Sequence, residues 1–453
     1  MKNKNTLRLS ALAYSLFALQ LAWASATPDE AARLKSDLTP FGAERAGNAD
    51  GSIPAWDGGY TKAPAGYKQG DKRADPFADE KVIVSINSTN LDKYADKLAE
   101  GTKVMLKKYP NYRLDIYPTH RTAAAPQWVY DNTFQNATRA KLDPKTENVS
   151  GAFGGIPFPI PKNGAEVLWN HRLSWNGGDS FTSSFDTWLM TAGGKKVLAT
   201  KTPYYFQYPY YFQDGSVDKF DGNYYQGKII TELPASKNGE GLMIYYNVTQ
   251  DNRASWQYLV GQRRVRRLPN VAYDTPNFVT SGVSYFDEAF MLFGPSDKHD
   301  AKLVGKKELY IPYNSNKSVL VPSDQLITPN FLNPDHVRWE KHRVWVVDAT
   351  LKAGQRHVVP RRTYYVDEDT WQIVLVDGYD AQGKLIRQQW SLPYLAPDLP
   401  ALTTQFGWGI YNVDTGAYVH GLSSNDSPVH YKRTERRQPS FFTPDAMANE
   451  SSR

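Results

Sequence analysis

Short turns between strand-like segments restrict the fold of this chain more than any other feature of its sequence. From about residue 165 onward, segments in which apolar and aromatic residues alternate or run together are separated by Gly-Gly, Asp-Gly and Asn-Gly turns; the first segment is VLWNHRLSW at 167–175. Turns this short join antiparallel strands, because a parallel connection needs a crossover of about a dozen residues or more. About ten such segments predict one large antiparallel sheet, and a sheet of that width curls because strand twist accumulates.

The residues before this sheet have a different texture. Residues 27–80 are rich in Gly, Pro, Asn and Asp, which interrupt helical and strand periodicity, so we expect a loop that lies against the rest of the molecule. Apolar residues at helical spacing predict a helix over 91–109, capped by Asn90 and stopped by Pro110. A weaker helical pattern covers 127–142. Two helices and a wide sheet predict an α+β fold that is mostly β.

The N-terminus has the three-part pattern of a secretory signal peptide. Basic residues within 2–8 precede an apolar run over 9–23, and positions 24–26 supply the small residues that a signal peptidase requires. The apolar run falls short of the roughly 20 residues that span a bilayer, and no cysteine is present to carry a lipid anchor. We therefore expect cleavage after Ala26 and a soluble mature chain, in which 27–453 form a single domain.

Composition narrows the class of protein. The chain has no cysteine, which excludes disulfides, thiol nucleophiles and cysteine-ligated zinc; a secreted chain of this kind is more typical of a bacterial periplasm than of a eukaryotic extracellular module. The formal net charge is +6, and three of these positive charges lie in residues 1–26, which hold no Asp or Glu, so the remainder carries +3. That excess is too small for a strongly basic nucleic-acid binder. We expect a periplasmic protein with no nucleic-acid partner.

The segment RVWVVDATL places apolar side chains on both faces of a predicted strand. Trp345 and Val347 point one way, whereas Val344 and Val346 point the other. One face could pack under helices while the other lines an interior that holds a single apolar ligand. A sheet packed between two ordinary cores would give the same pattern, so the residues alone leave both alternatives open.

Four segments of the chain resemble a known family. They are GGIPFPIPKNGAEVLWNHR, LVGQRRVRRLPN, LNPDHVRWEKHRVWVVDATL and RRTYYVDEDTWQIVLVD, with weaker support from LTPFGAERAGNADGSIPAW. Through them the chain resembles a long proteobacterial branch of the LolA/LolB-like lipoprotein-sorting superfamily, a branch known only as a domain of unknown function. The resemblance spans most of residues 150–380 and is more specific for family membership than for a ligand.

The resemblance implies a half-open barrel of antiparallel strands with helices over its concave face, where an apolar cavity ferries acyl chains through the periplasm. In that arrangement 27–150 form an N-terminal loop and helical cover, and 151–453 form mainly the sheet. The resemblance further implies an inner-membrane exporter of the resistance-nodulation-division class and an outer-membrane protein as partners, with no catalytic group and no cofactor. The side chains that we expect to line the cavity are Phe158, Trp169, Trp256, Tyr258, Trp345, Val347, Tyr364 and Trp371.

Four arginines follow the strand-like run SWQYLV. On a strand they divide between two faces, so all four cannot enter a dry interior, where unpaired charge is prohibitive. We expect at least two to pair with carboxylates, for which Asp287 and Glu288 lie near in sequence. Alternatively, with His171 they form a polar rim that grips a lipid head group or the acidic surface of a partner. The four are Arg263, Arg264, Arg266 and Arg267.

No other motif indicates catalysis or a metal. His171 stands alone in the first predicted strand, where a structural hydrogen bond is the more common role for a histidine. His336 and His342 share a face only in a continuous strand, and no pair of histidines has the spacing of a zinc site. Gly154-Gly155 lacks the Lys-Ser/Thr of a phosphate loop and is typical of a rigid turn, which in this family could belong to the cavity cover. The sequence has no GxSxG elbow.

Three functions of different classes fit these observations. The leading one is a periplasmic carrier of a lipid or another hydrophobic molecule. The others are a non-carrying adaptor between an exporter and an outer-membrane protein, and a carbohydrate-active enzyme, which would need two carboxylates about 5–10 Å apart across a cleft. If the face of Trp345 and Val347 lines the cavity, a glutamate at either position should abolish the binding of a hydrophobic dye.

Overall fold

The fold is described here from a computed structural model, in which residues 25–268, 273–404 and 407–452 are placed. The expected signal peptide lies outside these residues except for its last two positions. Ala26 donates its amide to the Ala137 carbonyl at 2.8 Å, and Ser25 Oγ donates to the Ala140 carbonyl at 2.6 Å. None of the helices within the placed residues is both long and apolar enough to cross a membrane.

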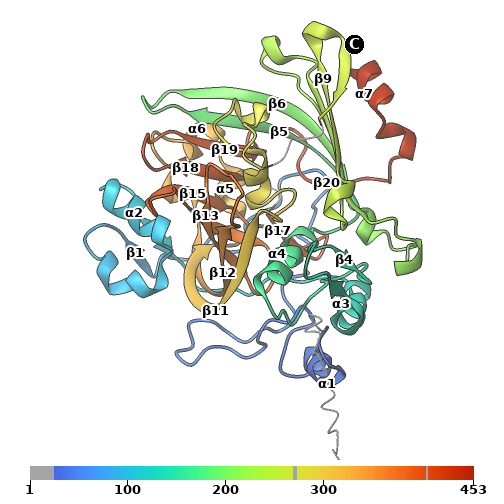
Figure 1. The fold of residues 1–453 in the computed structure, drawn as a ribbon. Coiled ribbons are helices and arrows are strands. Elements are labelled where there is room, and N and C mark those ends of the chain that lie inside the picture. Colours follow the sequence, from blue (N-terminus) through green and yellow to red (C-terminus); the bar gives the residue numbers. More distant parts are fainter. Residues whose placement is uncertain (1–24, 269–272, 405–406, 453) are drawn as a thin grey trace, which may run out of the picture.

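One sheet of sixteen strands forms the body of the molecule (Figure 1). Its strands are β1 (Val84–Ile86), β2 (Leu114–Ile116), β5 (Ser180–Met190), β6 (Lys196–Gln207), β7 (Asn223–Ile230), β8 (Gly241–Asn247), β9 (Ala254–Leu259), β10 (Arg264–Arg267), β11 (His299–Pro312), β12 (Trp339–Leu351), β13 (Arg361–Asp367), β14 (Ile373–Tyr379), β15 (Leu385–Ser391), β18 (Trp408–Asn412), β19 (Tyr418–Ser423) and β20 (Lys432–Arg433). Two further pairs stand apart: β3 (Lys141–Leu142) with β4 (Val149–Ser150), and β16 (Tyr394–Ala396) with β17 (Ala401–Thr403).

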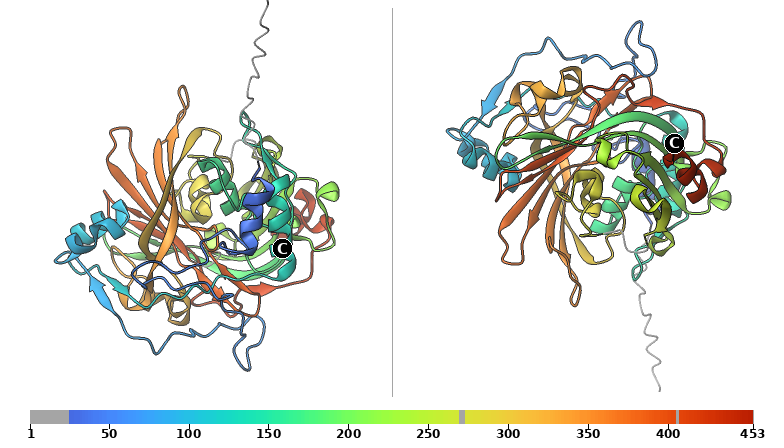
Figure 2. Two further views of the ribbon diagram at one scale, coloured as in Figure 1. Left: turned by 90° about the horizontal axis from the view of Figure 1, so that it is seen from below. Right: turned by 90° about the horizontal axis from the view of Figure 1, so that it is seen from above.

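The sheet is open and strongly curved (Figure 2). Its order is β1-β2-β12-β13-β14-β15-β18-β19-β5-β6-β7-β8-β9-β10, with β11 beside β12 and β20 beside β5. Neighbouring strands pair antiparallel, apart from the parallel contact of β2 with β12. Helix α4 (Gly164–Arg172) contacts β11 and β12, and the 3-10 turn Phe286–Met291 contacts β14, β15 and β18 from inside the curve. The predicted α+β fold, mostly β and built on one curved antiparallel sheet, is confirmed.

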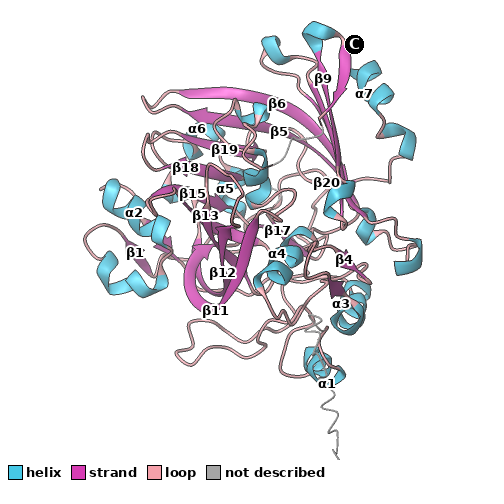
Figure 3. Cartoon of the chain, in the orientation of Figure 1, coloured by secondary structure: helices cyan, strands magenta, loops and turns pink. Residues whose placement is uncertain are grey.

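Both faces of the sheet carry a hydrophobic core. Val347 and Tyr364 belong to the core on the concave face, whereas Val344 and Val346 belong to the core on the convex face. Helix α4 lies on the concave side (Figure 3). On the convex side, α2 (Glu100–Lys108) packs against β14 and β15, and α7 (Pro444–Ser451) covers β7–β10. The remaining helices are α1 (Pro28–Ala32), α3 (Gln127–Arg139), α5 (Asn316–Leu320) and α6 (Ser323–Leu326).

The segment predicted as the first strand, 167–175, is mostly helix α4, so that prediction was wrong. Asn163 caps this helix by accepting a hydrogen bond from the Glu166 amide at 3.0 Å. Nearly every residue of α4 is buried. A helix that is buried all round has no polar face, so its sequence lacks the periodicity by which a surface helix is recognised.

The two predicted helices differ in outcome. The pattern over 127–142 is confirmed as α3. The pattern over 91–109 is divided, because extended backbone at Leu98 and Ala99 separates a 3-10 segment, Leu91–Lys97, from α2. The Asn90 side chain does not cap this 3-10 segment.

Helix α2 docks on the sheet through a buried carboxylate. Asp377 of β14 accepts hydrogen bonds from the Gly101 amide and from the Tyr365 hydroxyl, both at 3.0 Å. A Cβ atom at Gly101 would lie 2.3 Å from Asp377 Oδ1, so this contact requires glycine. Burial raises the pKa of Asp377 to about 7.

This raised pKa predicts that stability depends on pH. In the unfolded chain the Asp377 carboxyl ionises near pH 4, so the stability that its folded form contributes is complete below about pH 4 and is lost as the pH rises through 7. Asp377→Asn removes the ionisation and keeps an oxygen for the Gly101 amide. Relative to the wild type, we expect this variant to be about 2–4 kcal/mol more stable at pH 8 than it is at pH 4, that is, its free energy of unfolding minus that of the wild type rises by this amount. Urea unfolding at the two pH values measures this; a difference that does not change with pH would contradict it.

Candidate functional site

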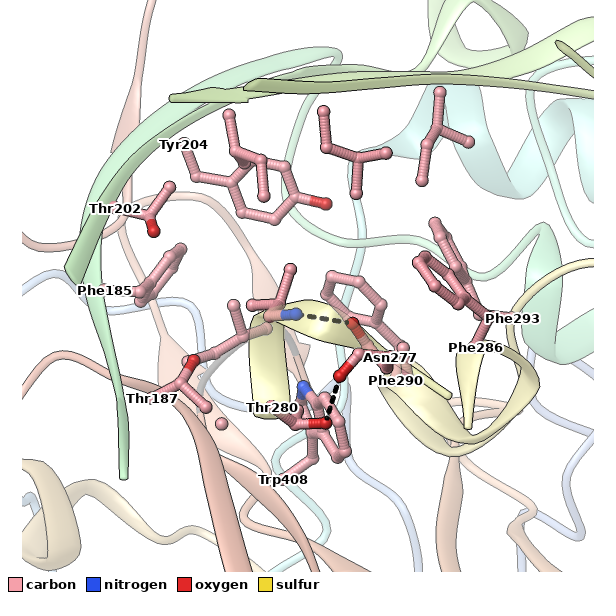
Figure 4. Close-up of a pocket in the computed structure, with 17 residues that line it drawn as sticks. Phe185, Thr187, Thr202, Tyr204, Asn277, Thr280, Phe286, Phe290, Phe293 and Trp408 are labelled. Carbon is pink, nitrogen blue, oxygen red and sulfur yellow. Dashed lines mark hydrogen bonds between the residues drawn. The ribbon is translucent and has the colours of Figure 1, made fainter. Parts of the chain in front are cut away.

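An apolar pocket lies on the concave side of the sheet, between β5–β8 and the segment 277–293 (Figure 4). The labelled rings of Phe290 and Phe293 face the strands across the cavity, which has a volume of about 70 Å³. Residues two apart on β8 share this face because side chains alternate along a strand. The lining consists of Phe185, Thr187, Thr202, Tyr204, Ile229, Leu242, Ile244, Asn277, Val279, Thr280, Phe286, Ala289, Phe290, Phe293, Trp408, Gly421 and Leu422.

Among the described residues, the lining contains no charged side chain and few free polar atoms. Thr202 Oγ1 and Trp408 Nε1 are buried and have no hydrogen-bond partner among the described residues. Asn277 is occupied by its own turn: its Oδ1 accepts from the Val279 amide and its carbonyl from Thr280 Oγ1, both at 3.0 Å. The pocket is therefore suited to hold a hydrocarbon group.

The floor of the pocket is fixed to the other half of the sheet by buried ion pairs. Asp287 accepts from Arg362 Nη1 at 2.7 Å and lies 2.9 Å from His357 Nε2, while Glu288 accepts from Arg387 Nη1 at 3.0 Å. Burial opposes ionisation of Asp287, but the Arg362 charge and the hydrogen bond with His357 outweigh it and lower the pKa of Asp287 below its ordinary value. The segment that closes the pocket is thus held at its middle by charge, and near its start Thr200 Oγ1 of β6 donates to the Val279 carbonyl at 3.2 Å.

Comparison with known proteins identifies the family. The family described as "Protein of unknown function (DUF1329)" matches residues 85–448. This chain belongs to the DUF1329 family. An uncharacterised protein of Pseudomonas aeruginosa is 36% identical over 461 aligned residues, which cover 99% of both chains.

Three solved structures are similar to the structure of this DUF1329 protein, although their sequence identity to it is low. A lipoprotein-sorting protein domain of Vibrio parahaemolyticus is 13% identical, covers 62% of this chain and 97% of its own, and has a TM-score of 0.43. A DUF1329 protein of Desulfovibrio piger is 16% identical, with coverages of 60% and 92% and a TM-score of 0.40. A LolA-superfamily protein of Nitrosomonas europaea is 10% identical, with coverages of 63% and 99% and a TM-score of 0.37.

None of the eight predicted cavity residues lines the apolar pocket of this DUF1329 protein. Trp345 stacks on Trp371 with ring centroids 5.9 Å apart, and Trp169 donates its indole N–H to the Glu147 carbonyl at 2.7 Å. Trp256 and Tyr258 pack under α7 on the convex face. The remaining three are buried in the concave core: Phe158, Val347 and Tyr364.

The predicted polar rim is not assembled. Arg263 lies in a turn and the other three arginines lie on β10, the last strand of the sheet, and all four are exposed. The expected pairing with Asp287 and Glu288 is wrong, because Arg362 and Arg387 occupy those carboxylates. His171 is in a helix and buried, where Nδ1 accepts from the Ile373 amide at 3.1 Å and burial lowers its pKa to about 3. It is a neutral structural residue.

A buried cluster on the convex side has the residue types of a metal site. His342, Asp367 and Asp369 bring potential ligand atoms within 4.8 Å of one another. Both Asp369 oxygens already accept from Arg121, at 2.6 and 2.9 Å, and Asp367 Oδ2 accepts from Thr370 Oγ1 at 2.7 Å. A cation there would lie beside a guanidinium, so the cluster is better explained as a structural ion-pair network. His336 does not belong to it.

A larger hollow, of about 480 Å³, lies between the loop after β6 and the C-terminal segment. Lys219, Arg436 and Arg437 line it, and Asp221 is its one carboxylate. A glycosidase of the usual kind requires two facing carboxylates. The described residues of this lining do not supply them.

The Gly154-Gly155 turn is not part of the lining of the apolar pocket. It packs against α3, where a Cβ atom at Gly155 would lie 2.4 Å from the Thr133 amide nitrogen.

The residues that form the apolar pocket were missed by sequence reasoning. Ile229, Leu242 and Ile244 lie in segments that were predicted as strands, but alternation alone does not say which face becomes concave. Phe290 and Phe293 follow the acidic pair Asp287-Glu288 in a segment with no regular period. The one usable signal was the density of aromatic residues in that segment.

Proposed function

We propose that this DUF1329 protein is a periplasmic carrier that shields a lipid or another hydrophobic molecule during transfer between the inner and outer membranes. The observation that carries the proposal is the apolar, charge-free pocket between β5–β8 and the segment 277–293. The secretory pattern of residues 1–26 supports the compartment, and the LolA-like resemblance supports the class of cargo.

The free energy of moving a lipid through water explains why such a carrier needs a dry pocket. Each buried methylene gains roughly 0.8 kcal/mol, so a chain of about fifteen methylenes gains on the order of 12 kcal/mol. Pockets for drug-sized ligands commonly measure about 300–1,000 Å³. The present cavity of about 70 Å³ is far smaller. Loading a whole alkyl chain therefore requires the Phe290 and Phe293 side chains to move away from β7 and β8.

Native mass spectrometry of protein prepared from a periplasmic extract tests the proposal. We expect a mass above that of the polypeptide, which organic extraction removes and converts into an identifiable lipid fraction. Extracted protein should then bind an alkyl dye saturably. A bare polypeptide mass together with no saturable dye binding would contradict a carrier function.

A second candidate function has one observation in its favour. The exposed arginines of β10 lie at the edge of the sheet without a carboxylate partner among the described residues. Such a surface suits an acidic partner, as an adaptor between an exporter and an outer-membrane protein would need. An adaptor would bind its partner tightly and purify without lipid.

A further inference from the structure

A second, more polar cavity adjoins the apolar pocket. It has a volume of about 40 Å³ and lies where the end of α4 meets β7 and the residue after β6. Phe290 and Phe293 line both cavities, so these two side chains form the partition between them. Among the residues on the far side of the partition are Arg172 and Tyr208.

The guanidinium of Arg172 forms no ion pair with a carboxylate of the described residues. Its guanidinium lies over the Trp169 ring at 4.8 Å, and all three of its guanidinium nitrogens are buried without a hydrogen-bond partner among the described residues. The large buried arginines elsewhere each hold a carboxylate. They are Arg73 with Asp398, Arg121 with Asp369, Arg338 with Glu340, Arg343 with Glu368, Arg362 with Asp287, and Arg387 with Glu288.

The local structure does not account for an unpaired charge at Arg172. Its place in the last turn of α4 is favourable for a cation, but that effect is worth only about 0.3–1 kcal/mol. Transferring an ion from water into a protein interior costs roughly several kcal/mol, unless a partner of opposite charge offsets this cost. The carboxylate of Glu147, which senses the Arg172 charge, is itself paired with Lys352 Nζ at 3.2 Å. An anion that enters the cavity would supply the missing partner.

Tyr208 offers a second donor to the same cavity. Its hydroxyl is buried and has no hydrogen-bond partner among the described residues. Burial keeps the pKa of Tyr208 well above its ordinary value, so the hydroxyl remains a neutral donor. A guanidinium and a hydroxyl on residues that line one cavity are a suitable set of donors for a carboxylate or phosphate oxygen.

The partition between the two cavities lies in unfavourable backbone geometry. Phe290 and Met291 both have positive φ angles, +50° and +72°, a region that residues other than glycine rarely adopt. Each such residue costs of order 1–3 kcal/mol and persists only where its surroundings hold it. A backbone rearrangement that takes Phe290 and Met291 out of this region would relieve the strain, and one that also moved the Phe290 and Phe293 side chains aside would join the cavities.

We propose that Arg172 and Tyr208 form the head-group subsite for an amphiphile whose alkyl chain occupies the apolar pocket and whose head is an anionic oxygen group. This inference rests on the proposed carrier function and names the class of its cargo. A carboxylate and a phosphate monoester share the required chemistry. A neutral alcohol of the same chain length does not.

Binding of three ligands with the same sixteen-carbon chain tests the inference. Palmitate, hexadecyl phosphate and hexadecanol, each below its micelle concentration, compete with an alkyl dye on lipid-extracted protein. We expect the wild type to bind palmitate or hexadecyl phosphate at least tenfold more tightly than hexadecanol, and the tighter of the two anions identifies the head group. Arg172→Met should abolish this preference and leave the affinity for hexadecanol unchanged, while Arg172→Lys restores part of it. Tyr208→Phe should weaken anion binding several-fold.

The controls separate the possible failures. Arg264→Met removes an exposed arginine of β10 and should change no affinity. The urea midpoint of Arg172→Met should stay equal to that of the wild type or rise, because the variant loses an uncompensated charge; a lower midpoint would indicate a structural role and contradict the inference. Equal binding of all three ligands by the wild type and Arg172→Met would overturn the subsite and leave the carrier intact. No binding of any of the three ligands by the wild type would overturn the carrier function itself.

Discussion

Ala289→Phe is expected to abolish the binding of an alkyl dye, with a loss in affinity of at least about tenfold. Ala289 lines the apolar pocket, and a phenyl group at this position would occupy the free volume of about 70 Å³. Filling the space leaves the ligand no apolar surface to bury. The overpacked variant should lose about 1–3 kcal/mol of stability and still fold. Fluorescence titration with the dye measures the affinity.

A matched variant outside the pocket controls for the added ring. Ala235 is exposed in the loop after β7, so Ala235→Phe adds the same group without touching the pocket. We expect its dye affinity to equal that of the wild type. A folded Ala289→Phe variant that binds the dye as well as Ala235→Phe does would place the ligand elsewhere.

Arg362→Met is expected to destabilise the protein by about 3–5 kcal/mol. Arg362 is buried on β13 and donates to both oxygens of Asp287, at 2.7 and 3.2 Å. Without the guanidinium, Asp287 would be left as a buried carboxylate with His357 as its remaining partner. The cost is that of an uncompensated buried charge, and it falls on the segment that closes the pocket. Urea unfolding monitored by tryptophan fluorescence measures it.

The neighbouring residue provides the control for this prediction. Arg361 lies on the opposite face of β13 and pairs with Asp348, and its side chain is 45% exposed. Exposed pairs are worth about 0–1 kcal/mol, so Arg361→Met should have little effect on stability. Equal losses from the two variants would show that the buried pair does not hold the segment in place.

The sheet could be predicted from the sequence because its determinants are local. Short Gly-containing turns and alternating apolar residues fix antiparallel pairing between neighbours in the chain, and both are visible without a structure. Helix α4 could not be predicted in the same way. It is buried on nearly all sides, so its composition resembles that of a buried strand, and the signal that was available was the cap at Asn163.

The pocket could not be predicted because it joins segments that are distant in sequence. Its strands, β5–β8, adjoin the rest of the sheet through the pairing of β5 with β19, which brings Trp188 opposite His420. Only that pairing decides which face of β7 and β8 becomes concave. Two of the predicted candidates, Trp345 and Val347, came from β12, whose concave face is covered by α4. A glutamate at Val347 would therefore test the core and not the pocket.

The role of a charged residue also could not be predicted from the sequence, as the arginines show. A run of four arginines is conspicuous in a sequence, yet the structure leaves all four exposed. Arg172 stands in the motif WNHR beside His171 and was not singled out. What distinguishes it is the lack of a partner for its buried nitrogens among the described residues, which is a property of the folded molecule alone.

Photolabelling tests most directly whether the apolar pocket between β5–β8 and the segment 277–293 holds the alkyl chain of the ligand. A palmitate analogue that carries a diazirine at the middle of its chain is bound to lipid-extracted protein, irradiated, and its adducts are located by peptide mass spectrometry. We expect adducts on β7, β8 and the segment 286–293, and we expect excess palmitate to suppress them. Adducts confined to the convex face under α7 or to the hollow lined by Arg436 and Arg437, or labelling that palmitate does not suppress, would contradict this expectation.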